Sequence, residues 1–331
     1  MREDIIRDRK EKREKLQKLG INPYPARVKR THTVAEVKES FQKLVQGGSP
    51  VFIAGRVRGL RKQGGIVFLD VEDESGRMQA VANAKTTANF KKIVPNLDGG
   101  DFVAVGGKLF TTKRGEKSVE VKKLVLLTKS LRPLPADYYG LEDTEVRLRQ
   151  RYLEMLMNPE VRRLFTRKAK FWATIRRELA AAGFTEVETG VLEAMPGGAE
   201  AEPFVTRHRA LDDDFYLRIS LEIALKKLMV GGWEKIFEIG RVFRNEGIDA
   251  EHLQDYTQME FYLAYTNYEE LMELVERMYK KVIKETFGTL IFEYNGKKVN
   301  WGKKWPKVDY FDIFKKKSGI DLKKATEAEF R

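Results

Sequence analysis

The chain has 331 residues, of which 42% are hydrophobic and 34% charged, and its formal net charge is +13. This length suggests about two domains, and the hydrophobic fraction excludes a globally disordered chain. Cysteine is absent, which excludes disulfides and thiolate metal sites, and three dispersed histidines (His32, His208 and His252) do not favour a zinc site. The positive charge favours a polyanionic partner, nucleic acid above all, with an ordinary basic enzyme as the alternative.

The N-terminal segment, residues 1–48, begins with a predicted helix over residues 2–20 that is dense in Arg, Lys and Glu. We favour a solvated helix here, with a basic helix along a nucleic-acid backbone as the alternative. The N-terminus lacks the apolar core of a signal peptide, and no apolar run approaches the roughly 18 residues of a membrane helix. We therefore expect a soluble, cytoplasmic protein with no membrane association.

Residues 49–130 change to short strands that Gly, Asp and Asn separate. The strands begin near Val51, Gly65, Met78, Asp101 and Ser118. About five strands in this length predict an OB-fold β-barrel, whose strand face and loops hold single-stranded nucleic acid. Arg61, Phe68 and Gln79 carry groups suited to stacking and base-edge contacts on that face, although the pattern alone favours a core position for Phe68.

A proline-stiffened linker over residues 131–144 separates this barrel from a second domain, residues 145–331. One helix is predicted from Pro159 to Gly183, and another begins at Asn267, with Glu270 as its capping partner, and ends at Gly288. Strands are predicted at 214–219, 234–244 and 256–265. An antiparallel sheet flanked by helices makes this domain α+β. Residues 303–331 are Lys-rich and poorly patterned.

Two of these strands carry charged side chains where an interior should be apolar. In the second strand, one face is mostly apolar and consists of Thr257, Met259, Phe261, Leu263 and Tyr265. The other face carries Gln258, Glu260 and Tyr262. In the first strand, Glu238, Gly240, Val242 and Arg244 share a face. This polarity predicts the floor of a site that binds a charged ligand.

Taken in order, seven segments resemble the class II aminoacyl-tRNA synthetases and, within that class, the lysyl-tRNA synthetases. The segments are 128–135, 149–153, 183–189, 196–199, 216–220, 228–232 and 243–247. The resemblance runs from the N-terminal helix to about residue 310. Aspartyl and asparaginyl enzymes share the barrel and the Arg-x-Glu hairpin, but Pro196-Gly-Gly-Ala199 and Met259-Glu-Phe-Tyr262 resemble the lysine enzyme.

The resemblance implies a ligase with two steps. The lysine carboxylate attacks the α-phosphate of ATP, which gives lysyl-adenylate and pyrophosphate, and the acyl group then passes to the 3′ end of tRNA(Lys). Positioning and neutralisation of phosphate charge supply most of such catalysis. Lysine, ATP, Mg²⁺ and tRNA(Lys) are the implied ligands, and a homodimer is the implied assembly.

The resemblance also implies the roles of the residues around ATP. Arg244 binds the α-phosphate and the lysine carboxylate, with a salt bridge to Glu246 or Glu260 as the alternative. Glu246 accepts a hydrogen bond from the adenine amino group, and Tyr256 takes the place of a Phe that stacks on adenine. His252 reaches the terminal phosphates, with a plain loop histidine as the alternative.

For lysine, a substrate ammonium needs a shielded carboxylate, and Glu260 with Tyr262 beside it is the best candidate. The resemblance gives Glu222 the α-amino group, although an acid in a first helical turn also favours the helix dipole. Gly198 lets the substrate approach the backbone closely. The positions that match the family's anticodon site, which for lysine reads a U-rich triplet, are Arg61, Phe68, Gln79 and Glu116.

The chain departs from the family pattern in several places. Gly190 and Leu221 replace prolines, Glu202 replaces a basic residue, and Glu251–Asp255 replaces a basic-His-Asn-Pro-Glu segment. The third class motif, with its arginine for ATP and its Mg²⁺-binding acids, is absent. We therefore expect a fragment that cannot form adenylate at a useful rate alone. A tRNA-binding module without catalysis and a ligase that modifies a protein lysine are the alternatives.

Overall fold

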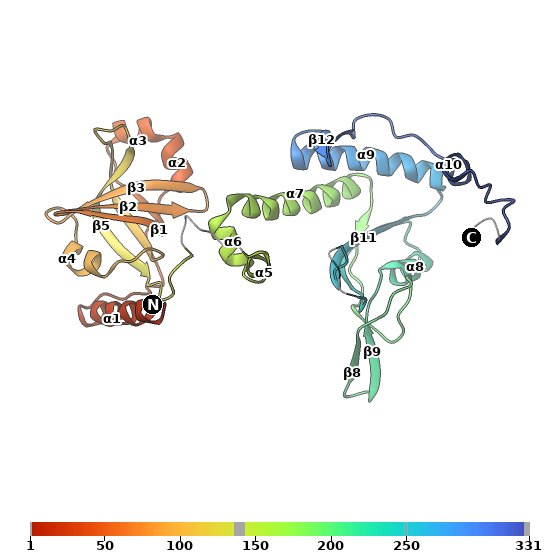
Figure 1. The fold of residues 1–331 in the computed structure, drawn as a ribbon, viewed down its shortest axis with the longest axis horizontal. Coiled ribbons are helices and arrows are strands. Elements are labelled where there is room, and N and C mark those ends of the chain that lie inside the picture. Colours follow the sequence, from red (N-terminus) through yellow and green to blue (C-terminus); the bar gives the residue numbers. More distant parts are fainter. Residues whose placement is uncertain (1, 136–142, 248, 250, 328–331) are drawn as a thin grey trace. The chain divides into compact units, whose positions relative to one another are not determined.

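The computed structural model describes residues 2–135, 143–247, 249 and 251–327, and the chain divides into two compact units, Met1–Asn158 and Pro159–Arg331 (Figure 1). Each unit is described by itself. Half of the linker predicted at 131–144, residues 136–142, lies outside the described residues.

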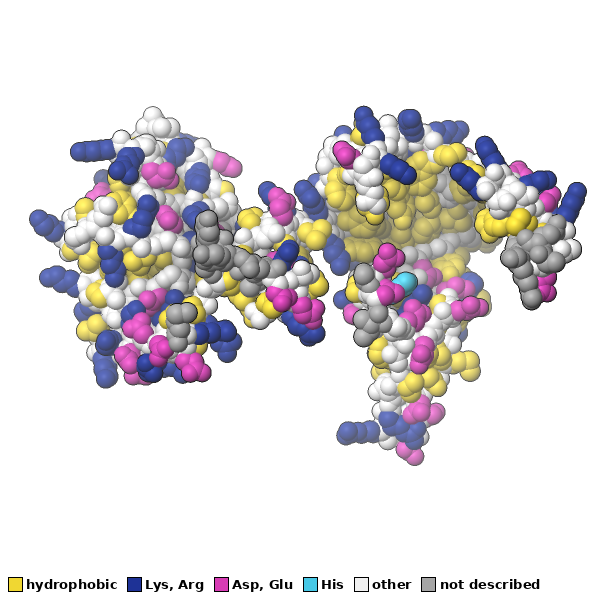
Figure 2. Space-filling model, viewed as in Figure 1, with side chains coloured by type: hydrophobic (Ala, Val, Ile, Leu, Met, Phe, Trp, Pro, Cys, Tyr) yellow, Lys and Arg dark blue, Asp and Glu magenta, His cyan; other side chains and the backbone are white. Residues whose placement is uncertain are grey.

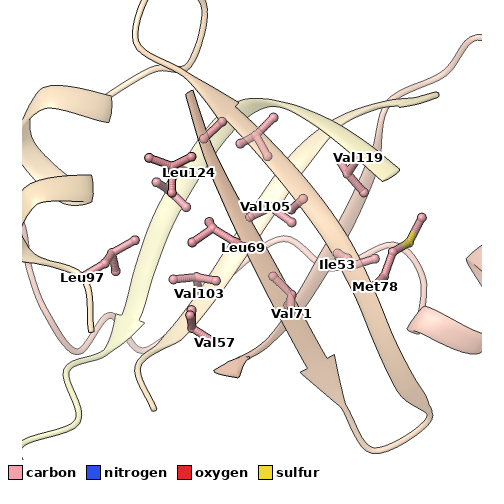
Figure 3. Packing of buried hydrophobic residues seen from close by; sticks show 14 of the residues in the cluster. Ile53, Val57, Leu69, Val71, Met78, Leu97, Val103, Val105, Val119 and Leu124 are labelled. Carbon is pink, nitrogen blue, oxygen red and sulfur yellow. The ribbon is translucent and has the colours of Figure 1, made fainter. Parts of the chain in front are cut away.

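The first unit contains a closed five-stranded barrel in the order β1-β2-β3-β5-β4, which confirms the predicted OB-fold. Its strands are β1 (Val51–Gln63), β2 (Ile66–Asp73), β3 (Gly76–Asn83), β4 (Phe102–Thr111) and β5 (Lys117–Thr128). Alternate side chains, such as Ile53, Leu69 and Val105, fill the interior because strand residues point in and out with period two (Figure 3). Phe68 points outward between Val67 and Leu69 and is partly exposed, so the core reading of Phe68 is wrong.

Helix α1 (Arg2–Lys18) is fastened to the barrel unit by one face. Arg9 is buried and donates hydrogen bonds to the carbonyl oxygens of Gly99, Ser130 and Arg132 at 3.1–3.2 Å. Leu16 is fully buried in the barrel's hydrophobic cluster. The prediction of a solvated helix is therefore wrong for one face of α1.

Short helices complete this unit. They are α2 (Val34–Glu39), α3 (Phe41–Gly47), α4 (Phe90–Ile93), α5 (Thr144–Arg149), α6 (Arg151–Met157) and the 3-10 turn η1 (Val94–Asn96). Thr33 and Glu36 form a reciprocal capping box at the start of α2. In α6, Glu154 is buried and pairs with Arg147 at 2.7 Å and with Arg151, which neutralises its charge.

The second unit packs α7 (Pro159–Ala181) and α9 (Tyr268–Phe287) on a three-stranded sheet in the order β11-β10-β6. The strands are β6 (Thr185–Glu186), β10 (Lys235–Phe243) and β11 (Asp255–Leu263). Met259, Phe261 and Leu263 pack against the helices, as the alternation predicts. Tyr265 lies beyond the strand with φ +57° and is 91% exposed, so its assignment to the apolar face is wrong.

A second small sheet, in the order β7-β9-β8, lies in the same unit. Its strands are β7 (Leu192–Glu193), β8 (Val205–His208) and β9 (Asp213–Leu217). The predicted strand at 214–219 therefore pairs with β7 and β8 rather than with β10 and β11, and the prediction of one sheet is wrong. A short helix, α8 (Glu222–Val230), follows β9.

The last part of the unit forms the hairpin β12 (Ile291–Tyr294) and β13 (Lys297–Asn300) and the helix α10 (Tyr310–Ser318). The Lys-rich stretch is thus more ordered than its pattern predicts. Hydrophobic side chains cover much of the surface beneath α9 (Figure 2). Within the described residues, no helix is both long and apolar enough to span a membrane.

Candidate active site and nucleic-acid interface

Segment 219–222, between β9 and α8, connects most of the predicted substrate-binding residues. The carbonyl oxygen of Ile219 accepts a hydrogen bond from Nε of Arg244 at 3.4 Å, and the backbone N–H of Leu221 donates to Oε1 of Glu260 at 3.2 Å. Leu221 is fully buried in a cluster with Ile236 and Val242, which fixes the segment against β10. The segment therefore contacts the polar side chains of both Arg244 and Glu260.

Glu260 is a half-buried carboxylate surrounded by hydrogen-bond donors. Besides Leu221, it accepts from Nε2 of Gln258 at 2.8 Å and from the hydroxyl of Tyr262 at 3.3 Å. Burial raises the pKa of Tyr262, and the nearby Glu260 and Glu222 carboxylates raise it further, so its hydroxyl stays protonated and donates. Among the described residues, no lysine, arginine or histidine forms an ion pair with Glu260.

Glu222 begins α8, and its carboxylate pairs with Lys226 at 2.6 Å. Gly198 lies against this turn with φ +84°. A Cβ added to Gly198 would be 2.1 Å from Oγ of Ser220 and 2.8 Å from Cβ of Glu222, so only glycine fits. The loop around Gly198 is tied to the same segment, because Oγ of Ser220 donates to the carbonyl oxygen of Gly197 at 3.0 Å.

Arg244 follows β10 directly and lies over an aromatic ring. Its guanidinium carbon is 5.6 Å from the centroid of the Tyr256 ring, and its backbone N–H donates to the carbonyl oxygen of Gln254 at 2.8 Å. The described ion pairs do not include one between Arg244 and Glu246 or Glu260, the alternative to a ligand-binding role. Among the residues that the structure describes, the guanidinium forms no ion pair, so it has donors for an anionic ligand.

The other predicted ATP-binding residues lie apart from this network. Glu246 is exposed, and His252 hydrogen-bonds through Nδ1 to Asp249 at 2.6 Å. The backbone N–H of Glu251 donates a hydrogen bond to Asp249 and lowers the pKa of its carboxyl group, and the interactions with His252 lower this pKa further. No hydrogen bond between the described residues joins Glu246 or His252 to segment 219–222.

The structure also contains a buried ion pair that was not predicted from the sequence. Arg218 donates to Glu238 at 2.6 Å, both side chains are 3–4% exposed, and Thr189 hydrogen-bonds to both. A Cβ on Gly240 would be 2.1 Å from Nη2 of Arg218, so glycine makes room for the guanidinium. Glu238, two residues before a glycine in an apolar strand, is the sequence signal that could have indicated a buried cation.

In the barrel, the four predicted anticodon residues line one cavity of about 610 Å³. The lining residues are Arg61, Gln63, Phe68, Asp70, Gln79, Thr112, Lys113, Arg114 and Glu116. Arg61 and Phe68 face each other across β1 and β2, with the guanidinium 5.9 Å from the ring centroid. Oε1 of Gln79 accepts from Ser118 at 3.0 Å, which orients the amide. An aromatic face, cations and an amide in one hollow suit unpaired bases.

Comparison with protein families assigns both units. Residues 143–329, more than half of the chain, match the family described as "tRNA synthetases class II (D, K and N)". The chain belongs to this family. Residues 51–127 match the "OB-fold nucleic acid binding domain", which corresponds to the barrel of this class II synthetase chain.

Lysine–tRNA ligases are among its similar relatives. The ligase of Moorella thermoacetica is 42% identical over 98% of this chain and 66% of its own length. That of Roseiflexus sp. is 43% identical over 98% of this chain and 67% of its own length, and that of Shouchella clausii is 42% identical over 96% and 65%. The synthetase chain thus spans about two thirds of the length of these relatives.

Proposed function

We propose that this chain carries the lysine-binding and tRNA-binding parts of a lysine–tRNA ligase. Family membership supports the reaction class, and the relatives' names support lysine as the amino acid. The observation that carries the proposal is Glu260, a half-buried carboxylate with three hydrogen-bond donors and, among the described residues, no cation. A carboxylate that is partly removed from water is stabilised by an opposite charge, and the ε-ammonium of lysine supplies one.

The neighbouring groups fit the rest of the amino acid. The carboxylate of Glu222, now paired with the exposed side chain of Lys226, accepts the substrate α-ammonium when Lys226 gives way. Arg244 donates to the substrate carboxylate and to the α-phosphate of ATP. It thereby holds the carboxylate oxygen in line for attack on phosphorus, with pyrophosphate as the leaving group.

For ATP, Tyr256 presents the ring that stacks on adenine, Glu246 accepts from the adenine amino group, and His252 reaches the terminal phosphates. Glu246 and His252 are both exposed, so each can turn toward the nucleotide. His252 must leave Asp249 to do so.

In the barrel, the cavity around Phe68 takes the U-rich anticodon of tRNA(Lys). Phe68 stacks on one base, Gln79 reads a base edge, and Arg61 and Glu116 border the hollow. Mg²⁺ and a homodimer belong to the proposal through the family alone. The described residues hold no group of three or more histidine, aspartate or glutamate side chains that could bind a metal ion, so no step is assigned to Mg²⁺.

Lysine-dependent exchange of pyrophosphate into ATP tests this proposal. The purified chain is assayed alone and together with the remaining third of a similar ligase. Exchange that needs lysine, in either case, supports the proposal. No exchange in both cases, with tRNA binding intact, favours a tRNA-binding module without catalysis and contradicts the ligase.

A further inference from the structure

A second basic hollow lies on the barrel, away from the cavity around Phe68. Its volume is about 210 Å³, below the roughly 300–1,000 Å³ of pockets for small organic ligands. We call it the outer-face pocket; its lining consists of Arg27, Val28, Lys29, Phe52, Ala104, Gly106, Lys123 and Val125. Three of these residues are cations and none is acidic.

The floor of the outer-face pocket is one row of residues across three strands. Phe52 on β1 is in register with Gly106 on β4, which is in register with Lys123 on β5. A Cβ on Gly106 would be 2.3 Å from Cε1 of Phe52, so the ring lies across β4 only because residue 106 is glycine. The hollow is therefore built by the sheet, with Lys123 at its edge.

The segment before α2, which is fixed to the barrel, forms one wall of the outer-face pocket. The backbone N–H of Thr31 donates to the carbonyl oxygen of Phe52 at 2.9 Å, and the N–H of Phe52 donates to Oγ1 of Thr31 at 2.9 Å. This pairing places Nζ of Lys29 at 4.6 Å from the Phe52 ring centroid. No ion pair among the described residues involves Arg27, Lys29 or Lys123, whereas their neighbours Arg30 and Lys122 pair with Asp73 and Glu120.

We infer that the outer-face pocket binds a backbone phosphate of the RNA that the barrel holds, outside the anticodon. This inference rests on the proposed tRNA-binding function. Three cations that form no ion pair among the described residues suit one phosphodiester group. The first half of β1 pairs with β4 and its second half with β2, so the pocket and the anticodon cavity belong to different sides of the barrel. Such a contact adds affinity and salt dependence without reading sequence.

The experiment measures binding of two RNAs to the full chain over a range of salt concentrations. The RNAs are a tRNA(Lys) transcript and a short U-rich anticodon oligonucleotide. The variants are Lys29→Gln with Lys123→Gln, the matched control Lys91→Gln at an exposed lysine of α4, and Phe68→Ala. In the double variant we expect tRNA affinity to fall at least about threefold and the salt slope by about 1–2, with oligonucleotide affinity unchanged. Phe68→Ala should weaken both RNAs, and Lys91→Gln neither.

Unchanged tRNA affinity and salt slope in the double variant would overturn the inference, and the proposed function would survive if Phe68→Ala still weakened binding. Failure of Phe68→Ala to weaken either RNA would count against the anticodon cavity instead. Inorganic phosphate serves as a second probe. Saturable shifts of the Gly106 and Lys123 amide resonances with phosphate, together with unchanged RNA binding, would assign the pocket to a free anion and also overturn the inference.

Discussion

The backbone N–H of Leu221 donates a hydrogen bond to Oε1 of Glu260 at 3.2 Å. The resemblance to the lysyl-tRNA synthetases implies a proline at this position, and proline has no N–H to donate. This departure therefore gives the proposed ammonium-binding carboxylate one more donor. Because Leu221 is fully buried, the donor is fixed in place, and Glu260 is oriented before a ligand arrives.

Gly198→Ala should disrupt the substrate loop. Its Cβ would be 2.1 Å from Oγ of Ser220, and φ +84° disfavours any other residue. We expect loss of lysine binding by at least tenfold, measured by calorimetry. Gly232→Ala is the control, because Gly232 has φ +101° but no atom within 4 Å of its Cβ position. It should cost only about 1–2 kcal/mol of stability, and equal binding by the two variants would contradict the packing argument.

Phe68→Ala should weaken binding of a U-rich RNA oligonucleotide, since stacking on an aromatic side chain contributes about 1–3 kcal/mol per base. Fluorescence anisotropy with a labelled oligonucleotide measures the change. Phe110→Ala, another partly buried barrel phenylalanine that does not line the cavity, is the comparison. An oligonucleotide affinity unaffected by Phe68→Ala would exclude the cavity as the base-binding site.

Arg218→Met should destabilise the second unit by about 3–5 kcal/mol, because it leaves Glu238 buried without its cation. Urea unfolding followed by tryptophan fluorescence reports this unit alone, since all four tryptophans lie between residues 172 and 305. The Arg177–Glu285 pair is more exposed, so Arg177→Ala should cost about 0–1 kcal/mol. Comparable losses in the two variants would show that burial of the Arg218 pair is unimportant.

Asp73→Asn should make the free energy of unfolding of the barrel depend less on pH in the acid range. Burial opposes ionisation of Asp73, but hydrogen bonds from Ser75 and Val34 and the charge of Arg30 outweigh it and lower its pKa. A carboxylate with a lowered folded pKa stabilises the fold above its unfolded value of about 3.9, and this stability is lost as pH falls through the folded value.

Far-UV circular dichroism during urea titrations from pH 7 to pH 3 measures this effect. The free energy of unfolding of the variant should be about 1–3 kcal/mol lower than that of the wild-type chain at pH 7, and the difference should be smaller at pH 3. Glu74→Gln is the control, because Glu74 is exposed and its side chain forms no hydrogen bond or ion pair with another described residue. An unchanged pH profile in Asp73→Asn would refute the role of Asp73.

Local patterns predict the barrel and the hairpin well, because both depend on alternation along the strands. The five barrel strands and the apolar face from Met259 to Leu263 follow directly from period-two patterning. The prediction that Phe68 is a core residue is wrong because it considers the residue alone. An aromatic residue between Val67 and Leu69 resembles a core residue, although the period-two alternation makes its position face outward.

Non-local pairing explains what the sequence does not predict. The partners of β9 are β7 and β8, strands of two and four residues that carry too little pattern to detect. Arg218 and Glu238 meet only because β9 and β10 come together in space. Likewise, the face of α1 that carries Arg9 is buried by carbonyl groups about 90 residues or more away, which no helical period indicates.

The central claim is that Glu260 recognises the lysine ammonium, and calorimetric titration of the chain with lysine and with norleucine tests it most directly. Norleucine keeps the alkyl chain and lacks the ammonium. The wild-type chain should prefer lysine, and Glu260→Gln should lose about 30-fold to 5,000-fold of that preference, since removing one member of a buried charge pair costs about 2–5 kcal/mol. Equal affinity of the wild-type chain for both ligands, or an unchanged preference in Glu260→Gln, would contradict the account.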